Sequence, residues 1–243
     1  MLLLYRFGLS IFYILMKFAS LWHPKAKLWV NGRQNWEKEL RKKVGKIESS
    51  VWFHFASLGE FEQGRPVLEA LKKAEPETNI IISFFSPSGY EIHKNYPLAL
   101  AVCYLPLDTT NNATTFIEII KPKYAVFTKY EYWFYFFRTL HQKHIPLYLI
   151  SGIFRKNQAF FKCYGGFYRQ MLSFITYFFV QNEESKTLLN SLGITQVSVN
   201  GDTRFDRVAE NAKNKKELKE IEAFCGSSKV LVAGSTWPAD EEL

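Results

Sequence analysis

The chain has 243 residues, of which 47% are hydrophobic and 22% are charged. This composition excludes an intrinsically disordered tail, a collagen-like fibre and a disulfide-stapled miniprotein. The cysteines, Cys103, Cys163 and Cys225, are far apart and form no CxxC pair, so neither a structural zinc site nor an oxidised framework is expected. Of the formal net charge of +8, +7 lies in residues 1–50, where ten Lys and Arg face three Glu.

Residues 1–22 are strongly apolar and predict a membrane anchor. Arg6 and Lys17 flank an uncharged run from Phe7 to Met16, which is shorter than the roughly 20 apolar residues of a bilayer span. A spanning helix would need both cations to reach the headgroups, whereas an amphipathic helix could lie in the interface. No small-x-small site for signal-peptide cleavage follows. A buried N-terminal helix with its cations in water remains the alternative.

Tryptophans alternate with cations directly after the predicted anchor, at Trp22, Lys25, Lys27, Trp29, Arg33 and Trp36. Tryptophans at the headgroup level and cations on anionic lipid are both membrane signals. A nucleic-acid partner is less well supported, because the basic charge adjoins the most apolar segment.

The body of the chain alternates between strand and helix patterns. Strands are expected at 51–56, 79–85, 101–105, 124–127, 146–150, 176–181, 196–200 and 229–233. Helices are expected at 66–73, 88–95, 111–120, 131–142, 164–174 and 183–192. Continuous apolar strands separated by single helices are typical of parallel βαβ units with helices on both faces. The fold class is therefore predicted to be α/β, with a Rossmann-like sheet.

The last part of the chain predicts the start of a second domain. Residues 209–224 form a charged helical pattern, 229–233 a strand, and 234–242 the beginning of another helix. We expect three parts: an anchor at 1–22, a Rossmann-like domain at 23–208, and at 209–243 a linker helix and the start of a second Rossmann-like domain whose remainder is missing.

Two motifs place charged residues just after predicted strands, at the edge where open α/β sheets bind ligands. In WFHFASLGE (52–60), a tight turn is expected at Gly59, and Glu60 could act as a general base. The spacing of Ser57 and Glu60 also fits a capping box, which needs no catalytic role. In KYEYW (129–133), Lys129 and Glu131 could steer a substrate, although a surface ion pair has the same pattern.

Two further motifs could bind phosphate. In GDTRFDR (201–207), Asp202 could cap a helix and Arg204 could hold a phosphate with its planar fork, unless it pairs with Asp206. Ser235 and Thr236 lie between a predicted strand and helix, where backbone N–H groups can cradle an anion. The histidines form no metal-ligand grouping, and His54 is expected to be a hydrogen-bonded core residue.

Seven segments in one order carry a family resemblance: WFHFASLGE (52–60), FSPSGYE (85–91), YLPLD (104–108), KPKYAVFTKYEYW (121–133), QNEES (181–185), GDTRFD (201–206) and AGSTWPADEE (233–242). Together they resemble the 3-deoxy-D-manno-octulosonic acid (Kdo) transferases of lipid A biosynthesis. The resemblance implies a GT-B fold, in which two Rossmann-like domains face a cleft. Residues 23–208 would bind the acceptor, and the missing remainder would bind CMP-Kdo.

The resemblance also implies residue roles. Glu60, in the SxGE motif with Ser57 and Gly59, would be the general base for an inverting transfer of Kdo to a lipid A precursor. Lys129 and Arg204 fall on positions that stabilise the transition state, although many relatives carry Glu where this chain has Lys129.

The remaining expectations concern ligands and location. Glu131 could orient Glu60 or the acceptor, and Ser235 and Thr236 could contact CMP. No metal or other cofactor is expected. Anionic lipid on the cytoplasmic face of the inner membrane is the expected surface. The 243-residue chain is expected to bind membrane without turning over. The alternatives are an inverting GT-B enzyme with another sugar nucleotide and a non-catalytic membrane-surface module.

Overall fold

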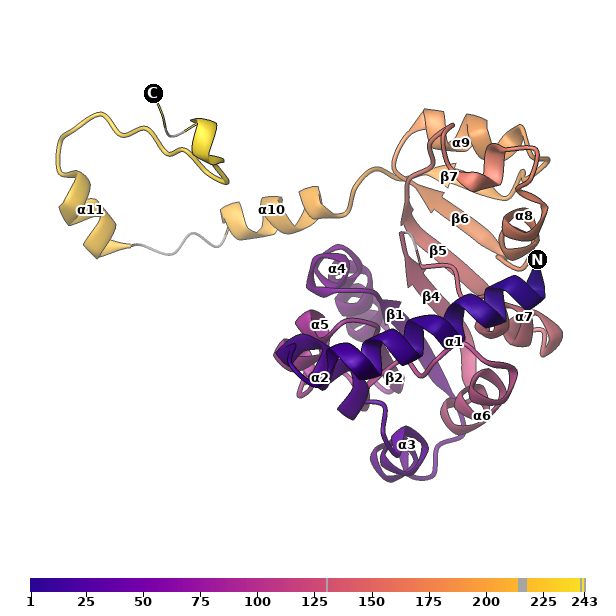
Figure 1. The fold of residues 1–243 in the computed structure, drawn as a ribbon. Helices are drawn as coiled ribbons and strands as arrows, with labels where there is room; N and C mark the ends of the chain where they lie inside the picture. The colour runs from indigo at the N-terminus through magenta and orange to yellow at the C-terminus, as the bar shows by residue number, and fades with distance from the viewer. Residues whose placement is uncertain (130, 214–217, 241, 243) are drawn as a thin grey trace. The chain divides into compact units, whose positions relative to one another are not determined.

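The computed structural model describes residues 1–129, 131–213, 218–240 and 242 (Figure 1). The chain divides into two compact units, Met1–Arg207 and Val208–Leu243. We describe each unit by itself.

The first unit is built on one parallel sheet. Its strands are β1 (Ser50–Phe55), β2 (Ile80–Phe84), β3 (Ala101–Tyr104), β4 (Pro122–Thr128), β5 (Leu147–Gly152), β6 (Tyr177–Val180) and β7 (Val197–Val199). Their order is β3-β2-β1-β4-β5-β6-β7, and every neighbouring pair is parallel. The predicted α/β class is thus confirmed, as are the first seven predicted strands. Buried on both faces, β1 and β2 follow the apolar pattern from which they were predicted.

Helices follow each of the first six strands. The first unit contains α1 (Leu2–Ala19), α2 (Pro24–Asn31), α3 (Trp36–Val44), α4 (Leu58–Ala74), α5 (Pro87–His93), α6 (Thr110–Ile120), α7 (Phe134–Gln142), α8 (Gly166–Leu172) and α9 (Glu183–Asn190). All six helices predicted between strands are present, within a few residues of the expected bounds except for α4. The helices α2 and α3 were not expected.

Successive residues of β1 point into two separate cores. Trp52 packs with Phe116 of α6 and Phe136 of α7 on one face of the sheet. Phe53 and Phe55 pack on the other face, where α4 contributes buried apolar side chains. This alternation is the two-residue period of a strand, and it leaves both faces of the sheet covered by helices.

The start of α4 was predicted wrongly at Pro66, because Gly59, Gly64 and Pro66 are all poor helix residues. The helix begins at Leu58 and includes all three. Packing explains Gly64, since a Cβ there would come within 2.2 Å of the Phe55 ring. Close contact between helix and sheet outweighs local propensity here.

Two residues assigned to the membrane surface belong instead to the protein interior. Trp29 is 2% exposed and Arg33 is 8% exposed. The Arg33 guanidinium lies 3.9 Å from the centre of the Trp29 ring. Trp36 is half-buried and its ring lies 6.0 Å from that of Phe116. Their interpretation as lipid contacts is therefore wrong, whereas Trp22 is exposed.

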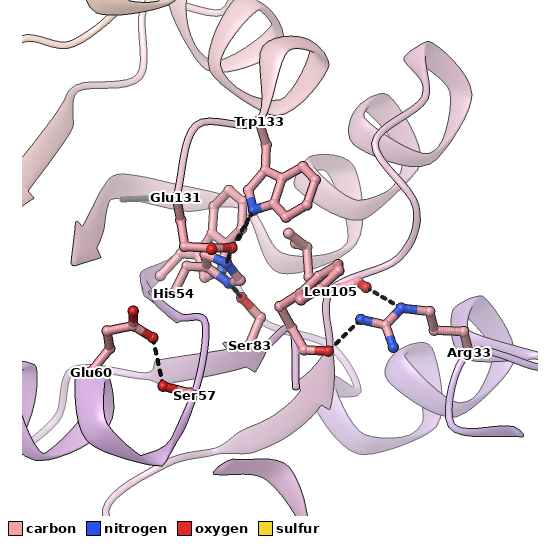
Figure 2. Close-up of polar contacts among 10 residues, drawn as sticks. Arg33, His54, Ser57, Glu60, Ser83, Leu105, Glu131 and Trp133 are labelled. Carbon is pink, nitrogen blue, oxygen red and sulfur yellow. Dashed lines mark hydrogen bonds and ion pairs between the residues drawn. The ribbon is translucent and has the colours of Figure 1, made fainter. Parts of the chain in front are cut away.

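Arg33 ties the α2 region to the carboxyl ends of two strands. Its Nε donates to the carbonyl oxygen of Leu105 at 2.8 Å, and its Nη2 donates to that of Phe85, also at 2.8 Å (Figure 2). Its Nη1 donates to the carbonyl oxygen of Trp29 at 3.1 Å. Burial lowers the pKa of Arg33 to about 9. A buried cation is thus satisfied by carbonyl groups that no strand pairing uses.

The second unit has less regular structure than predicted. The expected helix at 209–224 appears as α10 (Arg204–Lys213), which starts in the first unit, and α11 (Lys219–Cys225), with 214–217 outside the described residues. The predicted strand at 229–233 is wrong, since those residues are exposed and form no strand. Instead of a helix from Gly234, one short 3₁₀ turn forms at Pro238–Asp240.

Replacing Arg33 tests how much its hydrogen bonds to the ends of β2 and β3 contribute to stability. We expect Arg33→Met to lower the free energy of unfolding by roughly 3 kcal/mol, because it leaves three buried carbonyl groups without their donor. Urea unfolding in mild detergent, followed by tryptophan fluorescence, measures the change. The matched control is Arg41→Met, which removes an exposed pair with Glu37 and should cost less than about 0.5 kcal/mol. Equal losses in the two variants would contradict the assignment.

Candidate functional site

The order of the strands creates a candidate ligand-binding position at the carboxyl ends of β1 and β4. The chain leaves β1 towards β2 on one side and returns to β4 on the other side of β1. Loops at such a reversal diverge, and open α/β sheets bind ligands there. Glu60 follows β1, and Lys129 and Glu131 follow β4. The fold thus brings the first two predicted motifs to the same edge.

Glu60 is held by the residue that begins its helix. Ser57 is the N-cap of α4, and its Oγ donates to Oε2 of Glu60 at 2.8 Å (Figure 2). The Ser57 side chain accepts no backbone N–H, so the predicted capping-box bond is wrong. Gly59 lies inside α4 rather than in a turn, and a Cβ there would meet only Ser57 Oγ, at 4.0 Å. Position 59, next to Glu60 at the start of α4, therefore has open space around it in the described part of the chain.

A chain of hydrogen bonds crosses the buried sheet and ends at Glu131 (Figure 2). Trp52 Nε1 donates to Ser83 Oγ at 2.8 Å, and Ser83 Oγ lies 2.8 Å from His54 Nδ1. Because Trp52 can only donate, the Ser83 hydroxyl hydrogen is available for His54 Nδ1. We assign the hydrogen of His54 to Nε2, because this atom lies 3.3 Å from Oε2 of Glu131 and a carboxylate oxygen can only accept.

Trp133 completes this network at the edge of the sheet. Its Nε1 donates to Oε2 of Glu131 at 2.8 Å. The same nitrogen lies 3.3 Å from His54 Nε2, but it cannot donate there if that atom carries a hydrogen. Two donors therefore converge on one oxygen of Glu131. The side chain of His54 is fully buried and that of Glu131 is 16% exposed, so a fixed carboxylate faces the edge from a rigid support.

Lys129 lies among the other charges of the edge. Its backbone is left-handed, with φ of 56°, and its N–H donates to the carbonyl oxygen of Ile150. Partial burial lowers the pKa of Lys129, and the positive charge of Arg204 lowers it further, whereas Asp202 and Glu60 oppose this shift. Lys129, Arg204 and Glu60 thus act on one another electrostatically. Tyr130, within the same motif, lies outside the described residues.

The GDTRFD motif is fastened to α4. Asp202 Oδ1 accepts the backbone N–H of Arg204, as a cap does, and Oδ2 accepts from Nε and Nη2 of Arg204 at 2.8 and 2.5 Å. Arg204 thus pairs with Asp202, not with Asp206. Gln63 of α4 donates to Asp202 at 3.1 Å, and Thr203 donates to the carbonyl oxygen of Gln63. Burial alone would raise the pKa of Asp202, but the bonds from Arg204 and Gln63 lower it.

Ser235 and Thr236 belong to the second unit. Both are exposed, and Ser235 has a φ of 60°. Because the next helical turn begins only at Pro238, no helix N-terminus follows them directly. The predicted phosphate cradle therefore does not form in the described residues.

Sequence reasoning missed three residues that organise the site. Ser83 and Gln63 are buried polar residues, and Trp133 was noted only as part of its motif. The available signal was a polar residue inside an apolar strand or helix face, as at Ser83 in β2. His54 was predicted to be a hydrogen-bonded core residue, and this is confirmed. Among the described residues, no three His, Cys, Asp or Glu side chains converge as a metal site requires.

The fold and this edge define the class of protein: a Rossmann-like domain of the GT-B type. A UDP-GlcNAc 2-epimerase from Neisseria meningitidis aligns with a TM-score of 0.55 at 18% identity, over 72% of this chain and 54% of that chain. The Methanocaldococcus jannaschii enzyme of the same name gives 0.53 at 17%, over 76% and 54%. At these identities the likeness shows the fold alone.

The family itself follows from the sequence comparisons. The family profile described as 3-deoxy-D-manno-octulosonic-acid transferase (kdotransferase) matches residues 20–207. The chain therefore belongs to the Kdo transferase family.

Curated relatives agree with this assignment. A 3-deoxy-D-manno-octulosonic acid transferase from Chlamydophila psittaci is 27% identical over 79% of this chain and 46% of its own length. The Rickettsia typhi protein of the same name is 26% identical over 81% and 42%. A bifunctional glycosyltransferase/methyltransferase from Fusobacterium nucleatum is 28% identical over 82% and 32%. The chain spans 32% to 46% of the length of these relatives.

The direction of the hydrogen-bond chain predicts the tautomer of His54. Long-range ¹H–¹⁵N NMR of the imidazole should show hydrogen on Nε2 and a lone pair on Nδ1. Ser83→Ala removes the donor to Nδ1, and we expect the Nδ1 resonance to shift most among the imidazole nitrogens. Thr139→Val, which changes a buried hydroxyl of α7 outside the network, is the control. A wild-type spectrum with hydrogen on Nδ1 would refute the direction.

Proposed function

We propose that this chain is the acceptor-binding half of a Kdo transferase. In this proposal the whole enzyme moves Kdo from CMP-Kdo to a lipid A precursor in lipopolysaccharide synthesis, with inversion at the anomeric carbon. Membership of the family and the names of the curated relatives support the sugar. The observation that carries the mechanism is the position of Glu60, at the start of α4 and beside the carboxyl end of β1.

In the proposed reaction Glu60 is the general base. Its carboxylate takes the proton from a primary hydroxyl of the acceptor while that oxygen forms a bond to the anomeric carbon of Kdo. The bond from that carbon to the phosphate oxygen of CMP breaks, and CMP leaves with the electron pair. The hydroxyl of Ser57 orients the carboxylate, and Gly59, which has no side chain at the start of α4, lets the acceptor approach.

Arg204 and Lys129 are proposed to stabilise the negative charge that develops on the phosphate of CMP as it leaves. Arg204 has a planar fork that its bond to Asp202 holds in place, and phosphate oxygens can take the same donors. Lys129 adds positive charge from the end of β4. In this scheme the two cations, without a metal, neutralise the charge on the leaving phosphate.

Glu131 is proposed to position the acceptor. Its Oε2 is occupied by His54 and Trp133, so its orientation is fixed before a substrate binds. An open groove of about 420 Å³ adjoins it and is lined by Tyr132, Phe160 and Tyr168 among others. Apolar walls next to a fixed carboxylate suit an acceptor with a sugar headgroup and acyl chains. Such an acceptor places the enzyme on the cytoplasmic face of the inner membrane.

The proposal is tested with the longest open reading frame that contains this chain, incubated with CMP-Kdo and a tetra-acylated lipid A precursor. Mass spectrometry of the lipid measures the gain of Kdo. We expect Glu60→Gln to lower the turnover by roughly 10²- to 10⁴-fold, the usual contribution of a general base. Residues 1–243 assayed alone should give no turnover.

The control for this experiment is Glu62→Gln. Glu62 lies on the same helix, 3.9 Å from both Arg65 and His93, and its loss should leave turnover within about twofold. A Glu60→Gln variant as active as wild type would remove Glu60 from catalysis. Transfer of a sugar from another sugar nucleotide, with none from CMP-Kdo, would show that CMP-Kdo is not the donor.

A further inference from the structure

The outward face of α1 is apolar along its whole length. Large exposed side chains recur at Leu3, Leu4, Phe7, Ile11, Ile14, Leu15 and Phe18, between 41% and 79% exposed. This spacing is one face of an α-helix. In the described part of the chain, α1 is the one helix that is long and apolar enough to cross a membrane, and its mean hydropathy is 1.5. Composition alone therefore leaves both a spanning and an interfacial helix open.

The opposite face of α1 is fixed to the domain at more than one point. The Tyr5 hydroxyl donates to Oδ2 of Asp108 at 2.5 Å, and the Tyr5 ring lies 5.5 Å from that of Phe167. Two turns further on, the Phe12 ring lies 5.4 Å from that of Trp29. Because both points belong to the same compact unit, the helix axis runs across the domain rather than away from it (Figure 1).

The points of contact follow the carboxyl ends of three strands. Phe85 comes directly after β2, and its ring stacks 6.2 Å from Phe12. Asp108 follows β3, and Phe134 follows β4 with its ring 6.2 Å from Tyr5. Asp108 also accepts the backbone N–H groups of Tyr135 and Phe136, in the first turn of α7, at 3.0 Å. The helix α1 thus lies beside the same edge that holds Glu60 and Glu131.

The charges around α1 favour a lipid surface over a protein partner. Arg6 and Lys17 are exposed on the helix, and Lys25 and Lys27 are exposed just after it. Trp22 is 63% exposed and packs edge-on against Phe18. Cations and a tryptophan bordering an apolar stripe match the headgroups and acyl boundary of an anionic bilayer.

We propose that α1 lies in the plane of the membrane interface, with its outward face in anionic lipid, and holds the carboxyl edge of the sheet at the bilayer surface. A spanning orientation would carry Asp108 and the start of α7 into hydrocarbon along with the helix, since α1 is about 27 Å long and docked to them. The proposal concerns orientation and does not depend on which sugar is transferred.

Depth measurements on spin labels test the orientation directly. Cys103, Cys163 and Cys225 are replaced by Ser, and single labels are placed at Leu3→Cys, Ile11→Cys and Phe18→Cys. The full open reading frame is bound to vesicles of phosphatidylethanolamine and phosphatidylglycerol. Collision with oxygen and with a water-soluble nickel complex gives each label's depth. A label at Lys73→Cys, exposed near the end of α4 at the amino edge, is the control and should remain in water.

We expect the three labels on α1 to lie at one depth, roughly 5–10 Å into the interface. A steady change of about 22 Å between positions 3 and 18 would show a spanning helix and overturn the proposal. Labels that all remain in water, or that are shielded only by a second copy of the chain, would also overturn it.

A second measurement keeps the test independent of labelling. Replacing Phe7 and Leu15 together by Ser should lower partition onto the same vesicles at least tenfold, and it should leave the unfolding midpoint unchanged. Leu100→Ser removes a side chain of 41% exposure just before β3, at the amino edge, and should leave partition unchanged. Equal partition of both variants would contradict the assigned face.

Discussion

The buried position of β1 between two parallel neighbours is the constraint on which the site depends. β1 pairs with β2 on one side and β4 on the other, and all of its residues are buried. Every segment that leaves its carboxyl end, or that of β4, must therefore emerge at one edge. Glu60, Lys129 and Glu131 lie together for this reason, although about seventy residues separate the first from the others.

His54 and Ser83 are tolerated inside this sheet because both have hydrogen-bond partners. His54 and Ser83 would be costly in an apolar core if unpaired, but Trp52 and Glu131 complete their hydrogen bonds. The consequence is a carboxylate at the edge whose orientation is set by the core. Arg33 has a comparable role nearby, since it satisfies carbonyl groups at the ends of β2 and β3.

Much of the fold could be predicted from the sequence, because buried parallel strands are long apolar runs and the helices between them are amphipathic. The strand order could not, since no local pattern specifies which strands pair. The start of α4 was missed because Gly64 is selected by contact with Phe55, not by helix propensity. Arg33 and Trp29 were misread because a buried cation–aromatic pair has the same composition as a membrane surface. The roles of the site residues remain predictions.

The central claim is that the carboxyl edge of this sheet binds the acceptor at a membrane surface. A photoreactive analogue of the lipid A disaccharide precursor, crosslinked to the full open reading frame on anionic vesicles, tests it most directly, with the modified peptides identified by mass spectrometry. The account predicts adducts within residues 57–64, 129–133 and 201–204 that unmodified precursor suppresses. Adducts confined to other parts of the chain, or insensitive to the precursor, would contradict it.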